Sequence, residues 1–253
     1  MSASPARTRF QGVLQILQFN RHQYLAGLAG TMAATLAWRL LPALDPRALL
    51  LGTVPALFWM ASSLLVSHYV YDIFPLYDFR HVARLLARTP ERWINLHCGW
   101  DETSERLAEI FPVSSGQVVD IFDAHIMTEH SIRQARQVNR SNISAIPGRY
   151  DALPFNADFF DTDFSIFAAH ELRHHAQRVR LLREIARILA PRGELVVMEH
   201  SRDWRNFLAF GPGFFHFFSR RDWRRAFSQA GLIVRTELAM TPFVHVYILR
   251  RSL

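Results

Sequence analysis

The sequence predicts an α/β protein in which a doubly wound, mostly parallel sheet follows a pair of long apolar helices. Apolar residues 164–168 and 194–198 are short buried strands, and between them lie a helical segment and the turn Pro191-Arg192-Gly193. This strand, helix, strand order is a βαβ unit, which stacks into a parallel sheet. Upstream, residues 24–44 and 48–66 are apolar runs of about the 20 residues that span a bilayer as a helix.

Length and composition narrow the function. A chain of 253 residues holds one α/β domain of about 150–200 residues and something smaller. All 29 basic residues are Arg, which excludes a Schiff-base lysine and a Walker A phosphate loop. The net charge of +7 is spread along the chain without an aromatic-interleaved basic patch, so no nucleic-acid partner is expected. The single Cys98 cannot form an internal disulfide.

The two apolar runs predict a transmembrane helical hairpin. Arg39 alone interrupts the first run, and residues 45–47 leave room only for a tight turn. Arg residues flank both outer ends, so the positive-inside rule places those ends in the cytoplasm. We therefore expect a basic N-terminal segment (1–22), a hairpin (23–71) and a cytoplasm-facing domain (72–253) at a membrane. A buried hairpin of a soluble protein and a cleaved signal peptide are the alternatives.

The remaining elements follow from periodicity. In the helix of the βαβ unit, Leu181, Ile185 and Ile188 share one face and Arg residues occupy the other. Residues 118–123 predict a second strand, followed by a helix over 131–140. Near the C-terminus, a helix over 222–231 precedes two closing antiparallel strands, 231–234 and 243–249.

The βαβ region also resembles a known enzyme family. Asp151-Ala152-Leu153-Pro154-Phe155 is followed by a strand, by Arg183-Glu184 with Arg187 and Leu189, and by Pro191-Arg192-Gly193. This order resembles the second half of class I S-adenosylmethionine (SAM) dependent methyltransferases, of the type 11 and ubiquinone-menaquinone C-methyltransferase-like kind. The resemblance implies a Rossmann-like seven-stranded sheet, SAM as cofactor and a methyltransferase activity.

The glycine motif of that family is degenerate in this chain. Residues 93–104 stand in its place, and of its glycines only Gly99 remains. Asn95 replaces the usual acid, His97 the first glycine and Asp101 the third. The resemblance implies that Asn95, His97 and Gly99 line the cofactor. These departures also allow an alternative, a methyltransferase-like scaffold or binding subunit without cofactor.

Three more residues are expected at the cofactor. An acid at the end of the second strand accepts hydrogen bonds from ribose hydroxyls in nucleotide-binding sheets. We select Asp123 rather than Asp120, because the chain turns there; a helix-capping role is the alternative. On the adenine side the family usually has an acid where Arg149 stands, so Asp151 and Ala152 are expected nearby instead.

Catalytic groups should follow the strands, because ligands bind outside the carboxyl ends of parallel strands. His170 and His200 are the candidates for a base that takes the acceptor's proton, and His216 is a weaker one. Core or surface roles are the alternative for each histidine. The phenylalanine-rich segment 207–218 is broken by Gly-Pro-Gly, which indicates a loop beside the site, and packing in the core is the alternative. We therefore expect a hydrophobic or lipid-like acceptor.

One motif indicates a different chemistry. His170-Glu171-Leu172-Arg173-His174 satisfies H-E-x-x-H, in which two histidines one helical turn apart bind zinc and the glutamate activates water. A zinc hydrolase is therefore a further alternative. Against it, the motif directly follows a strand and lacks an evident third ligand, so no metal is expected.

Overall fold

The chain folds into two compact units. The computed structural model describes residues 8–41, 43, 45–138 and 141–252. Of the described residues, one unit comprises 76–202 and 215–252, and the other combines 8–75 with Asp203–Phe214. Residues 203–214, which the sequence analysis assigned to the C-terminal domain, thus belong with the helical unit. Part of the expected basic segment (1–7), and residues 42 and 44 of the first apolar run, lie outside the described residues.

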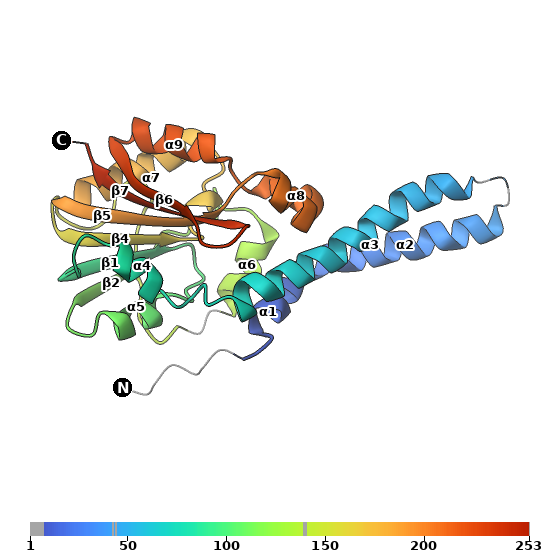
Figure 1. Ribbon diagram of the computed structural model, residues 1–253, viewed down its shortest axis with the longest axis horizontal. Coiled ribbons are helices and arrows are strands. Elements are labelled where there is room, and N and C mark those ends of the chain that lie inside the picture. Colours follow the sequence, from blue (N-terminus) through green and yellow to red (C-terminus); the bar gives the residue numbers. More distant parts are fainter. Residues whose placement is uncertain (1–7, 42, 44, 139–140, 253) are drawn as a thin grey trace. The chain divides into compact units, whose positions relative to one another are not determined.

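A seven-stranded sheet forms the centre of the larger unit, in the order β3-β2-β1-β4-β5-β7-β6 (Figure 1). The strands β1 to β5 pair in parallel, and β7 runs antiparallel to both of its neighbours. The bounds are β1 Arg92–His97, β2 Ser115–Asp120, β3 Ile146–Pro147, β4 Phe160–Ile166, β5 Leu189–His200, β6 Leu232–Ala239 and β7 Val244–Arg251. This confirms the predicted doubly wound, Rossmann-like seven-stranded fold.

Helices connect the strands. They are α4 Arg80–Leu85, α5 Ser104–Ile110, α6 His130–Gln137, α7 His175–Ile188 and α9 Arg220–Gln229, with a 3₁₀ turn at Ala169–Glu171. All residues of β4 are buried, as expected for a strand with neighbours on both edges and helices on both faces. The second strand β2 ends at Asp120, three residues earlier than the sequence indicated.

The family-like residues of α7 have a structural explanation. Glu184 and Arg187 form an ion pair at 2.8 Å. The Glu184 carboxylate accepts a hydrogen bond from the Leu153 amide, and Arg187 donates to the carbonyls of Leu153 and Phe155. The apolar side of the same helix, including Leu181 and Ile185, is fully buried. Helix α7 therefore fixes the turn 151–155 as well as covering the sheet.

The smaller unit is a helical hairpin with two additions. It contains α1 Gln11–Phe19, α2 Arg21–Leu40, α3 Pro46–His68 with a π-helical end at Tyr69–Ile73, and α8 Trp204–Phe210. Helices α2 and α3 pack together: Tyr24 Oη lies 2.9 Å from Ser63 Oγ, and a Cβ at Gly27 would lie 2.8 Å from Met60 Sδ. Helix α8 packs on α3 through Trp59 and Phe207, whose rings meet edge-on at 5.3 Å.

One helix of this unit is long and apolar enough to cross a membrane. It is the continuous segment Pro46–Ile73, and none of its apolar stretch is buried. Helix α2 is 20 residues long, but within the described residues no second helix meets the same criterion of length and apolar character. At the base of the hairpin, the buried Asp72 carboxylate accepts hydrogen bonds from the amides of Gly12 and Val13 and lies 2.9 Å from His68 Nδ1.

Candidate active site

The ends of β1, β4 and β5 place polar residues together at the carboxyl edge of the sheet. The thiol of Cys98, just after β1, donates a hydrogen bond to the Ala168 carbonyl at 3.3 Å and so joins the ends of β1 and β4. Phe167 adopts a positive φ of 50°, and its amide donates to the Met198 carbonyl of β5. A strained non-glycine residue of this kind often marks a functional edge.

The loop after β1 is held by its own polar side chains. The buried Asn95 amide donates to Thr103 Oγ1 at 2.8 Å and to Ser104 Oγ at 2.7 Å. One Asp101 oxygen accepts from the amides of Thr103 and Ser104 and so caps α5, while the other accepts from Ser141. The residues that replace the family's acid and third glycine thus stabilise this loop.

His97 and Gly99 form the turn itself. Gly99 has a φ of +87°, which L side chains rarely adopt. Its amide donates to His97 Nδ1 at 3.0 Å, so the imidazole proton resides on Nε2. Burial lowers the pKa of His97, so the ring is neutral near pH 7. Its Nε2 is buried and has no hydrogen-bond partner, which leaves a donor available at the expected cofactor position.

The acid at the end of β2 is Asp120. It lies opposite His97 in the parallel register, and its carboxylate is 3.9 Å from His97 Nδ1. The expected Asp123 lies beyond the strand, where its carboxylate accepts a hydrogen bond from the His125 amide. The strand-end position assigned to Asp123 therefore belongs to Asp120, because β2 ends three residues earlier. Ribose binding by the acid at this position remains a prediction.

Sequence reasoning did not anticipate Arg136 of α6. Its guanidinium donates to Asp120 at 2.5 Å and lies 4.3 Å from the centre of the Phe122 ring. A Cβ on Gly99 would come within 2.2 Å of Arg136 Cγ, so the arginine stem lies on the glycine. The only signal in the sequence was a basic residue in the helix after β2.

Asp151 and Ala152 lie in the turn that α7 fixes. Arg149 donates to both carboxylate oxygens of Asp151, at 3.0 and 3.2 Å, so the residue in the family's acid position holds the proposed substitute. The Ala152 amide donates to the Arg149 carbonyl. Arg149, Asp151 and Ala152 thus contact one another in this turn. That Asp151 and Ala152 contact the adenine remains a prediction.

His170 is the centre of a buried polar cluster. Its Nδ1 donates to Glu199 Oε2 at 2.7 Å, and its Nε2 lies 3.4 Å from Glu171 Oε1. Burial would lower the pKa of His170, but the charge of Glu199 and hydrogen bonds with Glu171 and Glu199 raise it to about 10. His170 is therefore a cation near pH 7 and cannot accept a proton in this state.

Glu171 and His216 complete the cluster. The Glu171 side chain is 8% exposed, and its Oε2 has no hydrogen-bond partner. Burial raises the pKa of this carboxyl, but the hydrogen bond and charge of His170 lower it further, below the ordinary value. His216 Nε2 lies 4.0 Å from Glu171 Oε1. The ionised Glu171 is thus the better-placed proton acceptor.

His200 occupies a different setting. Its Nδ1 donates to the Phe243 carbonyl at 3.1 Å, and its ring stacks on Phe217 at 4.7 Å between centroids. The residue is buried at the end of β5. These contacts give His200 a packing role, and its role as a base remains a prediction.

The H-E-x-x-H segment does not form the helix that a zinc hydrolase requires. His170 and Glu171 lie in the 3₁₀ turn, Leu172 is extended, and His174 is the exposed N-cap of α7. Two histidines bind one metal in this motif only when they lie one helical turn apart. Among the described residues, the group that could hold a metal consists of His170, Glu171 and His216, without His174.

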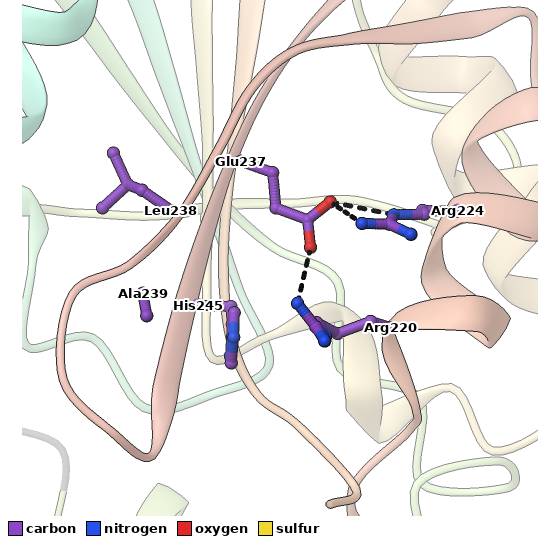
Figure 2. A pocket seen from close by; sticks show the side chains of 6 residues that line it. All are labelled: Arg220, Arg224, Glu237, Leu238, Ala239 and His245. Carbon is purple, nitrogen blue, oxygen red and sulfur yellow. Dashed lines mark hydrogen bonds and ion pairs between the residues drawn. The ribbon is translucent and has the colours of Figure 1, made fainter.

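A separate surface pocket lies beside β6 and α9. Figure 2 shows the Glu237 carboxylate between Arg220 and Arg224, with His245 nearby. Arg224 donates to Glu237 at 2.9 Å, so the acid is already paired with cations. This pocket offers no strand-end carboxylate for ribose, and we do not assign the cofactor to it.

Comparison with known proteins identifies the domain. Residues 95–197 match the family model described as methyltransferase domain. None of the curated proteins matches this chain. The fold is similar to that of a SAM-dependent methyltransferase from Methanosarcina mazei (16% identity, 70% of this chain and 99% of that one, TM-score 0.50). It is also similar to the pyocyanin biosynthetic protein PhzM (14%, 95% and 73%, 0.57) and the mitomycin 7-O-methyltransferase MmcR (15%, 98% and 74%, 0.54).

The site fits the cofactor of that domain. A glycine in the left-handed conformation, a carboxylate ending β2 and an unpartnered buried His97 Nε2 lie at the strand ends where nucleotide cofactors bind. The predicted enzyme class, a methyltransferase, and the predicted cofactor, SAM, are thereby confirmed.

Proposed function

We propose that this methyltransferase is anchored in a membrane, faces the cytoplasm and methylates a hydrophobic or lipid-like acceptor. The segment that follows β5 carries the proposal. Only two residues after His200, the chain enters 203–214, which packs within the apolar helical unit rather than with the sheet. Ser62 of α3 donates to the Leu208 carbonyl at 3.2 Å, and Trp204 and Leu208 are exposed.

This arrangement suits an acceptor that resides in a bilayer. Exposed large apolar side chains on a helix that abuts a spanning helix are typical of a membrane interface. The same segment connects directly to the strand end where Glu199 and His200 lie. An acceptor that partitions into lipid matches the apolar character of this unit. The Arg-bearing flanks of the hairpin support a cytoplasmic domain.

The chain's own residues have distinct tasks in methyl transfer. Asp120 and the turn at Gly99 would hold the cofactor, with His97 Nε2 as a donor. Bound SAM supplies an electrophilic methyl group on a sulfonium. The strand-end residues align the acceptor, because an in-line displacement depends mainly on positioning and exclusion of water. Glu171 Oε2, ionised and without a partner, would receive the acceptor's proton, while His170 and Glu199 keep that carboxylate in place.

Binding and transfer test the proposal separately. The full chain, purified in detergent, is titrated with SAM and with its demethylated product by calorimetry. It is then incubated with methyl-labelled SAM and either a membrane lipid extract or the water-soluble fraction of the same cells. We expect binding in the micromolar range or tighter and label in the lipid phase. Label only in water-soluble products would refute the lipid-like acceptor, and absence of binding would instead support a scaffold.

A further inference from the structure

We infer that His170, Glu171 and His216 form a binding site for a divalent transition-metal ion, with coordination positions left open for an oxygen atom of the acceptor. The inference deepens the proposed function and rests on it only for the role of the open positions. It replaces the sequence-based expectation that the chain holds no metal. The ligands differ from those of the H-E-x-x-H motif, because His216 takes the place of His174.

The three ligand atoms are spaced for one ion. His170 Nε2 lies 3.4 Å, and His216 Nε2 4.0 Å, from Glu171 Oε1, and all three lie within 4.8 Å of one another. Zinc binds nitrogen and oxygen at about 2.0–2.2 Å, so tetrahedral ligand atoms are about 3.4 Å apart. The first pair already has this spacing, and the second differs from it by about 0.6 Å.

The groups around the ligands are arranged as in metal sites. His170 Nδ1 donates to Glu199 at 2.7 Å, which directs Nε2 toward Glu171, and a bound metal ion would replace the proton that Nε2 carries in the metal-free chain. A carboxylate that holds the far nitrogen of a ligating histidine is the usual partner in such sites. Glu171 itself is more than nine-tenths buried, and its Oε2 has no partner, although a buried unpaired carboxylate oxygen is costly. A cation bound at Oε1 would offset the cost of burying this carboxylate and would leave Oε2 available for the acceptor's proton.

Arg173 holds the two histidine segments together. Its guanidinium donates to the carbonyls of His170 and His216, at 3.1 and 2.6 Å. On the other side of His216, Arg202 donates to the carbonyls of Phe215 and Phe217. Two histidines that are 46 residues apart in sequence are thus fixed by backbone contacts, as a preorganised site requires.

Two histidines and one carboxylate leave coordination positions vacant. This donor set is found in zinc enzymes with an open fourth position and in non-haem iron sites. His216 is the most exposed of the three ligands, at 28% of its side chain, so the open positions face the accessible side. An acceptor hydroxyl or carbonyl oxygen is the expected fourth ligand, because imidazole and carboxylate ligands retain a metal that also binds oxygen.

Metal binding is tested on the full chain, stripped with chelator in detergent and titrated with Zn²⁺, Mn²⁺ and Co²⁺ by calorimetry. We expect one ion per chain for at least one of the three metals. Glu171→Gln and His216→Ala should weaken the affinity for the metal at least about 100-fold, and Glu199→Gln should weaken it about 10- to 100-fold. His174→Ala is the matched control and should bind like wild type.

Circular dichroism and SAM titration of each variant separate loss of a ligand from loss of fold. Wild-type protein that binds none of the three metals, or metal lost in His174→Ala but kept in His216→Ala, would overturn the inference. SAM binding without metal binding refutes the metal site and leaves the methyltransferase intact. Metal binding without methyl transfer to any lipid supports the metal site and refutes the lipid-like acceptor.

Discussion

The side chain of Arg136 lies on Gly99, and its guanidinium is paired with Asp120. One residue of α6 thus covers the glycine turn and neutralises the carboxylate, the two features expected to receive the cofactor. The Arg136 side chain is 40% exposed, so this ion pair lies at the surface and not in the core. Arg136 therefore covers the turn at which the cofactor is expected.

Arg136→Ala should tighten the binding of SAM. Breaking a partly exposed ion pair costs no more than about 1 kcal/mol, so the expected gain is at most about fivefold in Kd. Calorimetry on wild type, Arg136→Ala and Arg133→Ala, an exposed position on the same helix, gives the comparison. Weaker binding in Arg136→Ala alone would show that the guanidinium contacts the cofactor instead.

Asp120→Ala should weaken SAM binding more than Asp123→Ala. A hydrogen bond to a charged acceptor is worth about 1.5–3 kcal/mol, and only Asp120 ends β2 beside His97. Asp123 serves a local turn, so its replacement should affect stability slightly and affinity little. Equal losses of affinity in both variants would mean that Asp120 is not the acid that binds the ribose.

Gly99→Ala should destabilise the fold by about 1–3 kcal/mol, because alanine rarely adopts a φ of +87°. The added methyl group would also collide with Arg136, so the double variant with Arg136→Ala should recover part of the loss. Gly213→Ala is a suitable control, since its Cβ would meet only Phe210 at 3.8 Å. Unfolding midpoints of all variants are measured in the same detergent. Equal midpoints for Gly99→Ala and Gly213→Ala would contradict the predicted destabilisation.

The parts of the fold predictable from sequence were those with strong local patterns. Apolar runs indicate β4 and β5, and the periodicity of Leu181, Ile185 and Ile188 defines the buried face of α7. The expected turn at residues 191–193 is wrong, because these residues lie within β5, at an irregularity in its pairing with β4. The end of β2 was misplaced because residues 118–123 are apolar and acidic throughout, so no turn residue marks where pairing with β1 stops.

Only the residues of the candidate site that directly follow a strand in the sequence were predictable. His170 follows β4 directly, but its state depends on Glu199, which lies 29 residues away in sequence. Arg136 reaches Gly99 from a separate helix, and His216 reaches Glu171 across a loop. Contacts of this kind come from the packing of elements that are distant in the sequence, so local sequence patterns cannot predict them.

The His170 cluster should make stability depend on pH. The pKa of His170 is about 10 in the folded chain against an ordinary value of 6.5, so the charged ring contributes stability that is fully present below pH 6.5 and is lost as pH rises through 10. The thermal midpoint of chelator-treated wild type should therefore exceed that of His170→Gln most at pH 6, and the gap should shrink toward pH 10. The exposed His174→Gln serves as the control and should show no such trend. A gap that widens with pH would mean that His170 is neutral in the fold.

Membrane insertion of α3 can be separated from mere surface exposure by a pair of substitutions. Phe58 lies near the middle of Pro46–Ile73 and is 53% exposed, while Val113 of the larger unit is 94% exposed. Arginine near the centre of a spanning helix costs about 2.5–3.5 kcal/mol on insertion scales, whereas arginine on a water-facing surface costs almost nothing. We therefore expect wild type and Val113→Arg to remain in the membrane fraction after alkaline extraction, and Phe58→Arg to be partly released or degraded. If the wild-type chain is itself extracted by alkali, or if Phe58→Arg behaves like Val113→Arg, the hairpin does not cross the bilayer and the proposed membrane anchoring is wrong.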